Sequence, residues 1–183
     1  ATKKQDWLHF HHQIYKTMTI SINNSFSVGF QNIHELHDQL GCKAKELEKD
    51  LKHDIKIWCE IWGCNCTLSF DSYEATTIEP QKHAWVKKGR KSGGFMILVK
   101  KDIDKKMINL VKQSNNFVWI EISKLLLKNV NQNIYIVASY INDITSIYYN
   151  DEIFEELNRD VLNFCDGSKP VLITGDLNSH TGK

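Results

Sequence analysis

VLITGDLN, residues 171–178, is the stretch that decides the fold class of this 183-residue chain. A short apolar run that ends in Gly-Asp is typical of a strand buried on both faces, as in a parallel sheet. Sheets of this kind bind ligands at the carboxyl ends of their strands. We therefore expect Asp176 and Asn178, which leave this strand, to lie at a functional edge.

The segments before this strand alternate between strand and helix patterns. Apolar or alternating runs predict strands at 25–33, 54–62, 67–70, 94–100, 117–122 and 133–140. Apolar side chains at helical spacing predict one helix over 40–54 and a second over 150–164. This order predicts a layered α/β architecture with helices outside the sheets.

Four of these strands carry polar side chains at or near their carboxyl ends. These residues are Asn32, Glu60, Tyr140, and Asp176 with Asn178. A carboxylate inside an apolar strand is costly unless it is paired or bound to a cation. Glu60 is such a residue, although a one-residue shift of register would turn it to the surface, and that alternative has about equal weight. Carboxylate and amide oxygens suit magnesium or manganese.

Composition excludes several classes of protein. The chain has 42% hydrophobic and 25% charged residues, which is typical of one globular domain. No apolar run approaches the roughly 18 residues that a membrane helix needs, so no membrane partner is expected. The five cysteines are odd in number and irregularly spaced, which argues against a disulfide framework and indicates an intracellular compartment.

The domain is expected to be continuous over residues 25–183, after a polar leader of residues 1–24 without an assigned fold. Charge is unevenly distributed within it. The net charge is only +1, but residues 82–128 carry 12 basic and 3 acidic side chains. Lys87, Lys88, Arg90 and Lys91 cluster there ahead of Gly93, in a loop suited to backbone phosphates. An ordinary solvated lysine-rich loop is an equally weighted alternative.

Five strings in order resemble the endonuclease/exonuclease/phosphatase superfamily, especially the apurinic-endonuclease-like domains of non-LTR (LINE-type) retrotransposons. They are VGFQNIHEL (28–36), DIKIWCEIWG (54–63), GRKSGGFMILVKK (89–101), IYIVASYI (134–141) and VLITGDLNSHTG (171–182). The resemblance implies an α/β four-layer sandwich, in which two β-sheets are flanked by helices. It also implies hydrolysis of a phosphodiester in DNA with Mg²⁺ or Mn²⁺, and hence a nuclear location.

The resemblance carries over to the strand-end residues one by one. Asn32 is similar to the first-strand Asn near the phosphate, and Glu60 to the metal-ligand Glu. Tyr140 resembles the tyrosine that contacts the scissile phosphate. Asp176 and Asn178 match the Asp-x-Asn pair that positions the attacking water and the phosphate.

Departures from the family pattern limit this expectation. Ile141 and Asn142 stand where a proline commonly follows the tyrosine, and the family's later Asp and His segment has no match after Asn178. We therefore expect a domain that is incomplete at its C-terminal end and inactive alone, with a reverse-transcriptase region downstream in the full-length protein. A non-catalytic remnant that binds nucleic acid or protein is the alternative. A phospholipid or inositol phosphate substrate is a third, weaker possibility.

Overall fold

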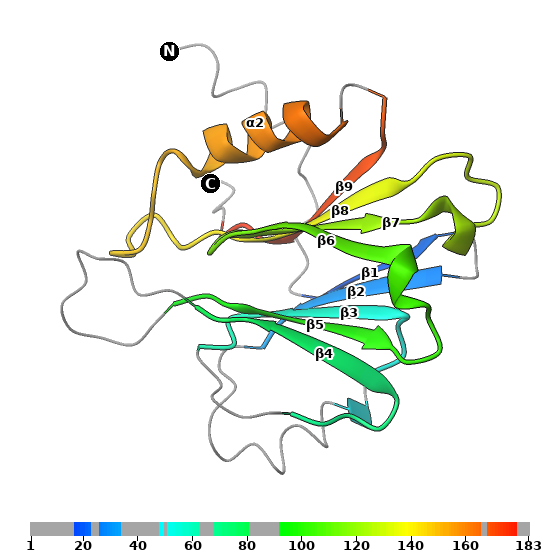
Figure 1. Ribbon diagram of the computed structural model, residues 1–183. Coiled ribbons are helices and arrows are strands. Elements are labelled where there is room, and N and C mark those ends of the chain that lie inside the picture. Colours follow the sequence, from blue (N-terminus) through cyan, green and yellow to red (C-terminus); the bar gives the residue numbers. More distant parts are fainter. Residues whose placement is uncertain are drawn as a thin grey trace.

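The computed structural model describes most of the chain between residues 17 and 178. The described residues are 17–22, 26–33, 48–49, 51–62, 68–80, 92–165 and 168–178. They form two mixed β-sheets and one long helix, which together make an α/β sandwich (Figure 1).

The first sheet has five strands in the order β1-β2-β3-β5-β4. Its central strands are β2 (Phe26–Asn32), β3 (Ile55–Cys59) and β5 (Phe95–Lys100), and its edges are β1 (Thr17–Ile22) and β4 (Tyr73–Ile78). Strands β2 and β3 run parallel, so both reach their carboxyl ends at the same edge, where Asn32 pairs with Cys59. The other neighbouring pairs are antiparallel.

The second sheet has four strands in the order β6-β7-β8-β9. These are β6 (Ile108–Gln113), β7 (Phe117–Ile122), β8 (Ile134–Tyr140) and β9 (Val171–Asp176). The last two are parallel, which places Tyr140 beside Asp176 in register. The helix α2 (Ile153–Cys165) connects them, and short 3-10 turns occupy Lys105–Met107 and Lys124–Leu126.

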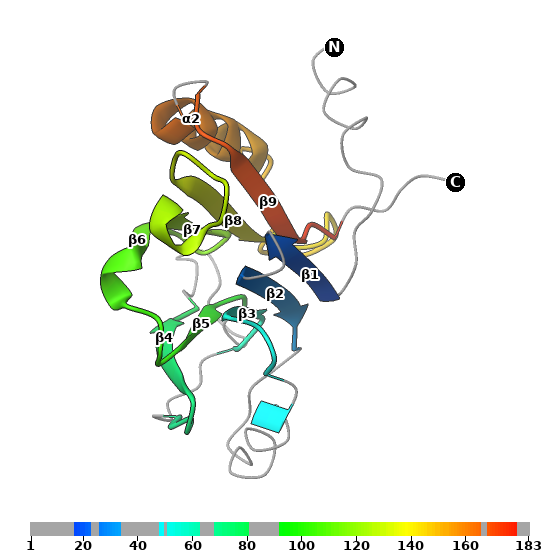
Figure 2. The same cartoon turned by 90° about the vertical axis from the view of Figure 1, so that its right-hand side faces the viewer.

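The main core lies between the two sheets. Side chains from both sheets meet there, including Phe30, Ile57, Ile120 and Ile136, each 1% exposed or less. A second cluster around Trp119 fills the space beneath α2, which covers the outer face of the four-stranded sheet (Figure 1). At one side the sheets meet directly, because β2 contacts β9 (Figure 2). This contact brings the carboxyl ends of the two parallel strand pairs together.

Most predicted elements are confirmed. Strands occur within 25–33, 54–62, 94–100, 117–122, 133–140 and 171–176, and α2 matches the helix predicted at 150–164. Of the helix predicted over 40–54, residues 40–47 and 50 lie outside the described residues, and 48 and 49 are helical. Its predicted end is wrong, because residues 51–54 are not helical and lead through a bend into β3.

Three expectations need correction. Residues 68–70 are not a strand; the strand begins at Tyr73. Strand β1 lies inside the segment 1–24 to which no fold was assigned, and it pairs with β2 along its full length. Strand β9 is only half-buried rather than buried on both faces, because it is the edge strand of its sheet.

No helix in the described part of the chain is long and apolar enough to cross a membrane. Two cysteines fall within the described residues, Cys59 and Cys165, and both are buried and outside any disulfide.

Candidate active site

Four strand ends from both sheets converge on one group of polar side chains. Asn32 ends β2 and Asp176 ends β9, and Nδ2 of Asn32 donates to Oδ2 of Asp176 at 2.8 Å. This hydrogen bond joins residues 144 positions apart and links the two sheets at their carboxyl ends. The structure thus brings together residues that the sequence places only at separate strand ends.

Glu60 follows β3 directly and is buried, at 7% exposed. Its backbone is left-handed, with φ 58°, so the chain turns at this residue and does not continue the strand. Residues other than glycine rarely adopt this conformation, and such positions cluster at functional sites. The turn directs the carboxylate inward, where Oε1 accepts a hydrogen bond from the phenol of Tyr140. The surface-facing alternative for Glu60 is therefore wrong.

Tyr140 is held as a neutral phenol. Burial raises its pKa well above the usual value, and the hydrogen bond to Glu60 and the negative charge of that carboxylate raise the pKa further. A hydrogen bond with Ser92 acts in the opposite direction. Because the phenolate is disfavoured, the hydroxyl of Tyr140 remains a hydrogen-bond donor at neutral pH.

Asp176 is positioned by a close contact between β8 and β9. Gly175 has φ 152°, and a Cβ there would lie 2.0 Å from the carbonyl oxygen of Ser139, so only glycine fits. The backbone N–H of Asn178 donates to Oδ1 of Asp176 at 3.1 Å. Both carboxylate oxygens of Asp176 therefore accept hydrogen bonds from predicted site residues.

Asn178 is exposed and has a left-handed backbone, with φ 42°. Its Nδ2 donates to the carbonyl oxygen of Ile141 at 2.8 Å, which fastens the segment after β9 to the segment after β8. Asn178 lies with the group as predicted, and its amide is engaged by the main chain.

The carboxylates of Glu60 and Asp176 both lie close enough to the buried Cys59 thiol to change its pKa. Burial raises the pKa of Cys59 well above its usual value, and the negative charges of Glu60 and Asp176 both raise it further. Two carboxylates that lie near the same buried group repel each other unless a cation compensates them. Among the described residues no group of three or more His, Cys, Asp or Glu side chains gathers. Magnesium needs few protein ligands, because it keeps several water molecules in its coordination shell. A pair of carboxylates with a neighbouring amide oxygen is therefore a donor set that suits this ion.

The predicted phosphate-contact residues Lys87, Lys88, Arg90 and Lys91 lie outside the described residues. The end of the same loop is placed at the site. Gly93 has φ 81°, a Cβ on it would touch the Tyr140 ring at 3.5 Å, and its carbonyl accepts from the N–H of Trp62 at 3.2 Å.

Two residues at this edge were missed by sequence reasoning. Asn142 is 7% exposed, and its Oδ1 accepts a hydrogen bond from Oγ of Ser92 at 2.8 Å. Ser92 stands in the GRKSGG string, but the pairing spans 50 residues and no local pattern reveals it. The place of Asn142 two residues after Tyr140 was the available signal.

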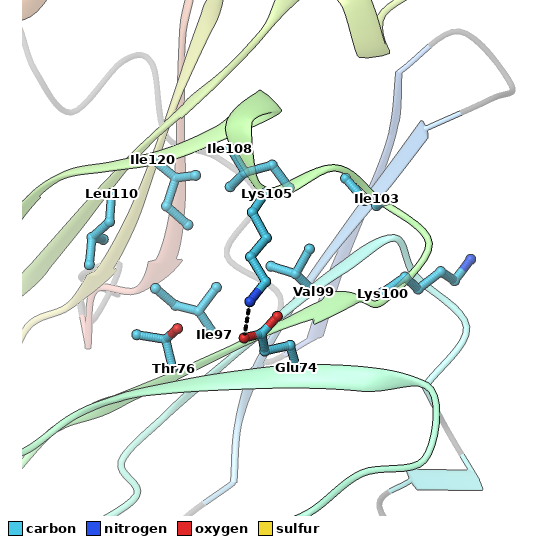
Figure 3. Close-up of a pocket in the computed structure, with 10 residues that line it drawn as sticks. All are labelled: Glu74, Thr76, Ile97, Val99, Lys100, Ile103, Lys105, Ile108, Leu110 and Ile120. Atoms are coloured by element: carbon cyan, nitrogen blue, oxygen red, sulfur yellow. Dashed lines mark hydrogen bonds and ion pairs between the residues drawn. The ribbon is translucent and has the colours of Figure 1, made fainter.

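A pocket of about 170 Å³ lies elsewhere, between the two sheets at the side of β4 and β6 (Figure 3). Aliphatic side chains such as Ile97, Val99 and Ile120 line it, and an ion pair of 2.5 Å between Lys105 and Glu74 lies at its border. None of the strand-end residues lines this pocket. It is a gap in the apolar core and has no connection with the polar group.

The fold is shared with proteins of known structure. The chain is similar to the catalytic domain of human Nocturnin, with 14% identity and a TM-score of 0.57 over 94% of this chain and 72% of that one. It is similar to an AP endonuclease from Leishmania major, with 16% identity and a TM-score of 0.59 over 97% of this chain and 63% of that one. A 3'-5' exonuclease from Neisseria meningitidis matches with 15% identity and a TM-score of 0.50, over 82% of this chain and 57% of that one.

These likenesses show that the chain shares the α/β sandwich fold of these three structures, as the sequence predicted. The chain spans less than two thirds of the length of the AP endonuclease and the exonuclease. No protein-family model matches the chain, and no curated protein matches its sequence.

Proposed function

We propose that the chain is a divalent-metal-dependent phosphodiesterase, a DNA endonuclease domain of retrotransposon origin that nicks target DNA. One observation carries this proposal: residues from four strand ends of two sheets meet through the Asn32–Asp176 and Tyr140–Glu60 hydrogen bonds. No structural reason requires two carboxylates, an amide and a phenol at one sheet edge. Their shared chemistry suits a phosphate and its cation.

Glu60 would hold the cation, and Asp176 and Asn32 lie at the neighbouring strand ends, where their negative charge and amide oxygen favour it. Nδ2 of Asn32 donates to Asp176, and the oxygen of a side-chain amide is the atom that can bind a cation. When bound, a divalent cation neutralises negative charge that develops on the phosphoryl oxygens. Magnesium or manganese fits this donor set equally well.

The chain's own residues supply orientation and hydrogen bonds. Asp176 is fixed through both oxygens, so its carboxylate is oriented to accept a proton from an attacking water. Tyr140, kept neutral by burial and Glu60, would redirect its one hydroxyl hydrogen from Glu60 to a phosphate oxygen when substrate is bound and a cation engages Glu60. The amide of Asn178 can exchange its main-chain acceptor for the phosphate.

DNA is the substrate that the resemblance supports, and nuclear DNA is the target we propose. The basic residues Lys87, Lys88, Arg90 and Lys91 would contact the phosphate backbone without reading sequence. The fold similarity to an AP endonuclease and to an exonuclease agrees with a nucleic-acid substrate.

The resemblance also places an Asp and a His after the Asp-x-Asn pair, and the 183 residues hold no match for that segment. We therefore propose that these 183 residues have little activity alone. In the full-length protein, further residues and a reverse-transcriptase region would complete the function. The competing outcome is a remnant that binds DNA without cutting it.

Plasmid nicking with magnesium tests this proposal. The 183-residue chain is compared with a version extended by about 70 residues of its downstream reading frame, the shortfall from a typical domain of this architecture. We expect only the extended protein to nick, and Glu60→Gln in it to reduce the rate by about 10²-fold or more. Glu121→Gln, a half-buried glutamate of β7, is the matched control and should nick normally. Salt-sensitive DNA binding without nicking by either protein would refute catalysis and support the remnant.

A further inference from the structure

Ser92 lies at the point where the loop before β5 reaches the candidate active site. The next residue, Gly93, packs against the Tyr140 ring and accepts a hydrogen bond from Trp62, two residues after Glu60. The hydroxyl of Ser92 also lies beside the phenol of Tyr140, where it would favour the phenolate and so lowers the pKa of that phenol. While the phenol is protonated, the one hydrogen of Ser92 is donated to Asn142. Ser92 is thus held between the Glu60 turn and the end of β8.

The hydroxyl of Ser92 fixes one end of the Asn142 amide. Oγ of Ser92 donates to Oδ1 of Asn142 at 2.8 Å, and Asn142 is nearly buried. A carboxamide has an acceptor oxygen at one end and a two-hydrogen donor nitrogen at the other. In this orientation the oxygen faces Ser92 and the NH₂ group faces away from it. A flipped amide would keep a hydrogen bond to the Ser92 hydroxyl but would turn its oxygen, an acceptor, toward a bound anion.

The NH₂ group of Asn142 has no acceptor in the part of the chain that the structure describes. A donor of a nearly buried side chain that has no acceptor in the protein is satisfied by water or by a ligand. Asn142 follows Tyr140 by two residues at the strand end that carries Asp176 in register. An anion bound between these residues would be the natural acceptor.

We propose that Ser92 is a positioning residue that orients the Asn142 amide so that its NH₂ group donates to a phosphate oxygen of the substrate. This inference rests on the proposed function, since it assigns a phosphate contact to the same site. Asn142 is then a direct contact with the substrate, whereas Ser92 acts through it. A purely structural role for Ser92, fastening its loop to β8, is the competing explanation.

Titration of the 183-residue chain with inorganic phosphate, in the presence of magnesium, tests the proposal without requiring catalysis. The measured signal is the side-chain NH₂ resonance of Asn142 in a nitrogen–proton correlation spectrum, assigned with Asn142→Asp. We expect a saturable shift in the wild-type protein. Ser92→Ala should weaken phosphate binding roughly tenfold, because one oriented hydrogen bond is lost.

Ser92→Thr keeps the hydroxyl and should restore wild-type binding, which loop anchoring by packing alone would not predict. Ser123→Ala is the matched control: it removes a half-buried serine hydroxyl that accepts from Leu125 at the opposite end of β7. It should leave phosphate binding unchanged. If Ser92→Ala does not fold, Ser92→Cys, of similar size but a poor donor, takes its place with the same expected loss.

The proposal is overturned if the Asn142 resonance does not respond to phosphate, or if the variant without the hydroxyl binds phosphate as the wild type does. Failure of the proposed function is a separate result. In that case neither the chain nor its extended version nicks DNA, while the Asn142 resonance still responds to phosphate and depends on Ser92. In an active extended protein, Ser92→Ala should raise KM roughly tenfold with a smaller change in kcat, because the contact forms with bound substrate as well as in the transition state.

Discussion

Replacing Gly175 with alanine tests the contact that positions Asp176. The new Cβ would lie 2.0 Å from the carbonyl oxygen and 2.4 Å from Oγ of Ser139, at a backbone φ of 152°. The carbonyl belongs to a strand and cannot rotate away, so β9 must separate from β8 at this point. Both the ladder between Ser139 and Gly175 and the adjacent Asp176–Asn32 bond are then disturbed.

The size of the effect follows from two contributions. An unfavourable backbone conformation costs about 1–3 kcal/mol, and the loss of one ladder hydrogen bond costs about 1 kcal/mol. We expect Gly175→Ala to lower the free energy of unfolding by about 2–4 kcal/mol. Urea unfolding followed by circular dichroism measures this change through the shift of its midpoint.

Gly93→Ala is the matched control for this experiment. Gly93 also has a positive φ, 81°, but a Cβ there meets its nearest atoms at 3.4 and 3.5 Å, which is ordinary contact. Gly93→Ala should therefore lower the free energy of unfolding by about 1 kcal/mol, the cost of the unfavourable backbone conformation alone. Equal destabilisation by the two substitutions would refute the argument that close approach of β8 and β9 requires glycine.

Three further predictions concern hydrogen bonds and charges. Tyr140→Phe leaves the buried Glu60 without its phenol donor and should cost about 1.5–3 kcal/mol in urea unfolding; an unchanged midpoint would show that this bond contributes nothing. Because the pKa of Tyr140 is raised in the folded state, its contribution to stability should be constant below pH ~10 and fall as pH rises above that unfolded value, and this slope should vanish in Tyr140→Phe. Lys112→Met removes the partner of the nearly buried Asp160 (2.6 Å) and of Glu156 (3.0 Å), so thermal unfolding should show a loss of about 1–3 kcal/mol, which adding Asp160→Asn should partly restore. Asn32→Asp places a carboxylate against Asp176 and should destabilise the protein without metal, while magnesium should raise its melting temperature more than that of the wild type; no difference in the magnesium effect would contradict a cation site there.

The central strands were predictable because their burial leaves a simple pattern. Strands β3 and β8 are buried along their whole length, so each appears in the sequence as an apolar run. The carboxyl ends of such strands are where ligands bind, so Asn32, Glu60, Tyr140 and Asp176 could be singled out before their contacts were known.

Of the edge strands, β9 was predicted, but β1, β4 and β6 were not. Strand β4 exposes half of its residues and contains Glu and Thr, so it lacks an apolar run. In β6 the register shifts between Leu110 and Lys112, which breaks the two-residue alternation. Strand β1 does alternate, in TMTISI, and it was missed because residues 1–24 as a whole are polar. In β4 and β6 tertiary pairing, and not local hydrophobicity, determines the strand.

Site geometry was predictable only in part. The strand-end rule indicates which residues lie at one edge, but not which side chains contact each other. The left-handed turn at Glu60 and the Ser92–Asn142 hydrogen bond depend on how distant segments pack. The resemblance, which follows Tyr140 with a proline, gave no reason to examine Asn142.

Binding of manganese to the 183-residue chain is the most direct test of the central claim, that the strand ends form a cation site. Paramagnetic Mn²⁺ broadens the resonances of nearby nuclei, so it locates the ion without any need for activity. We predict that low Mn²⁺ concentrations broaden the side-chain amides of Asn32 and Asn178, and that Glu60→Gln removes this broadening while Glu121→Gln preserves it. Broadening confined to the acidic face of α2, or unchanged by Glu60→Gln, would contradict the account.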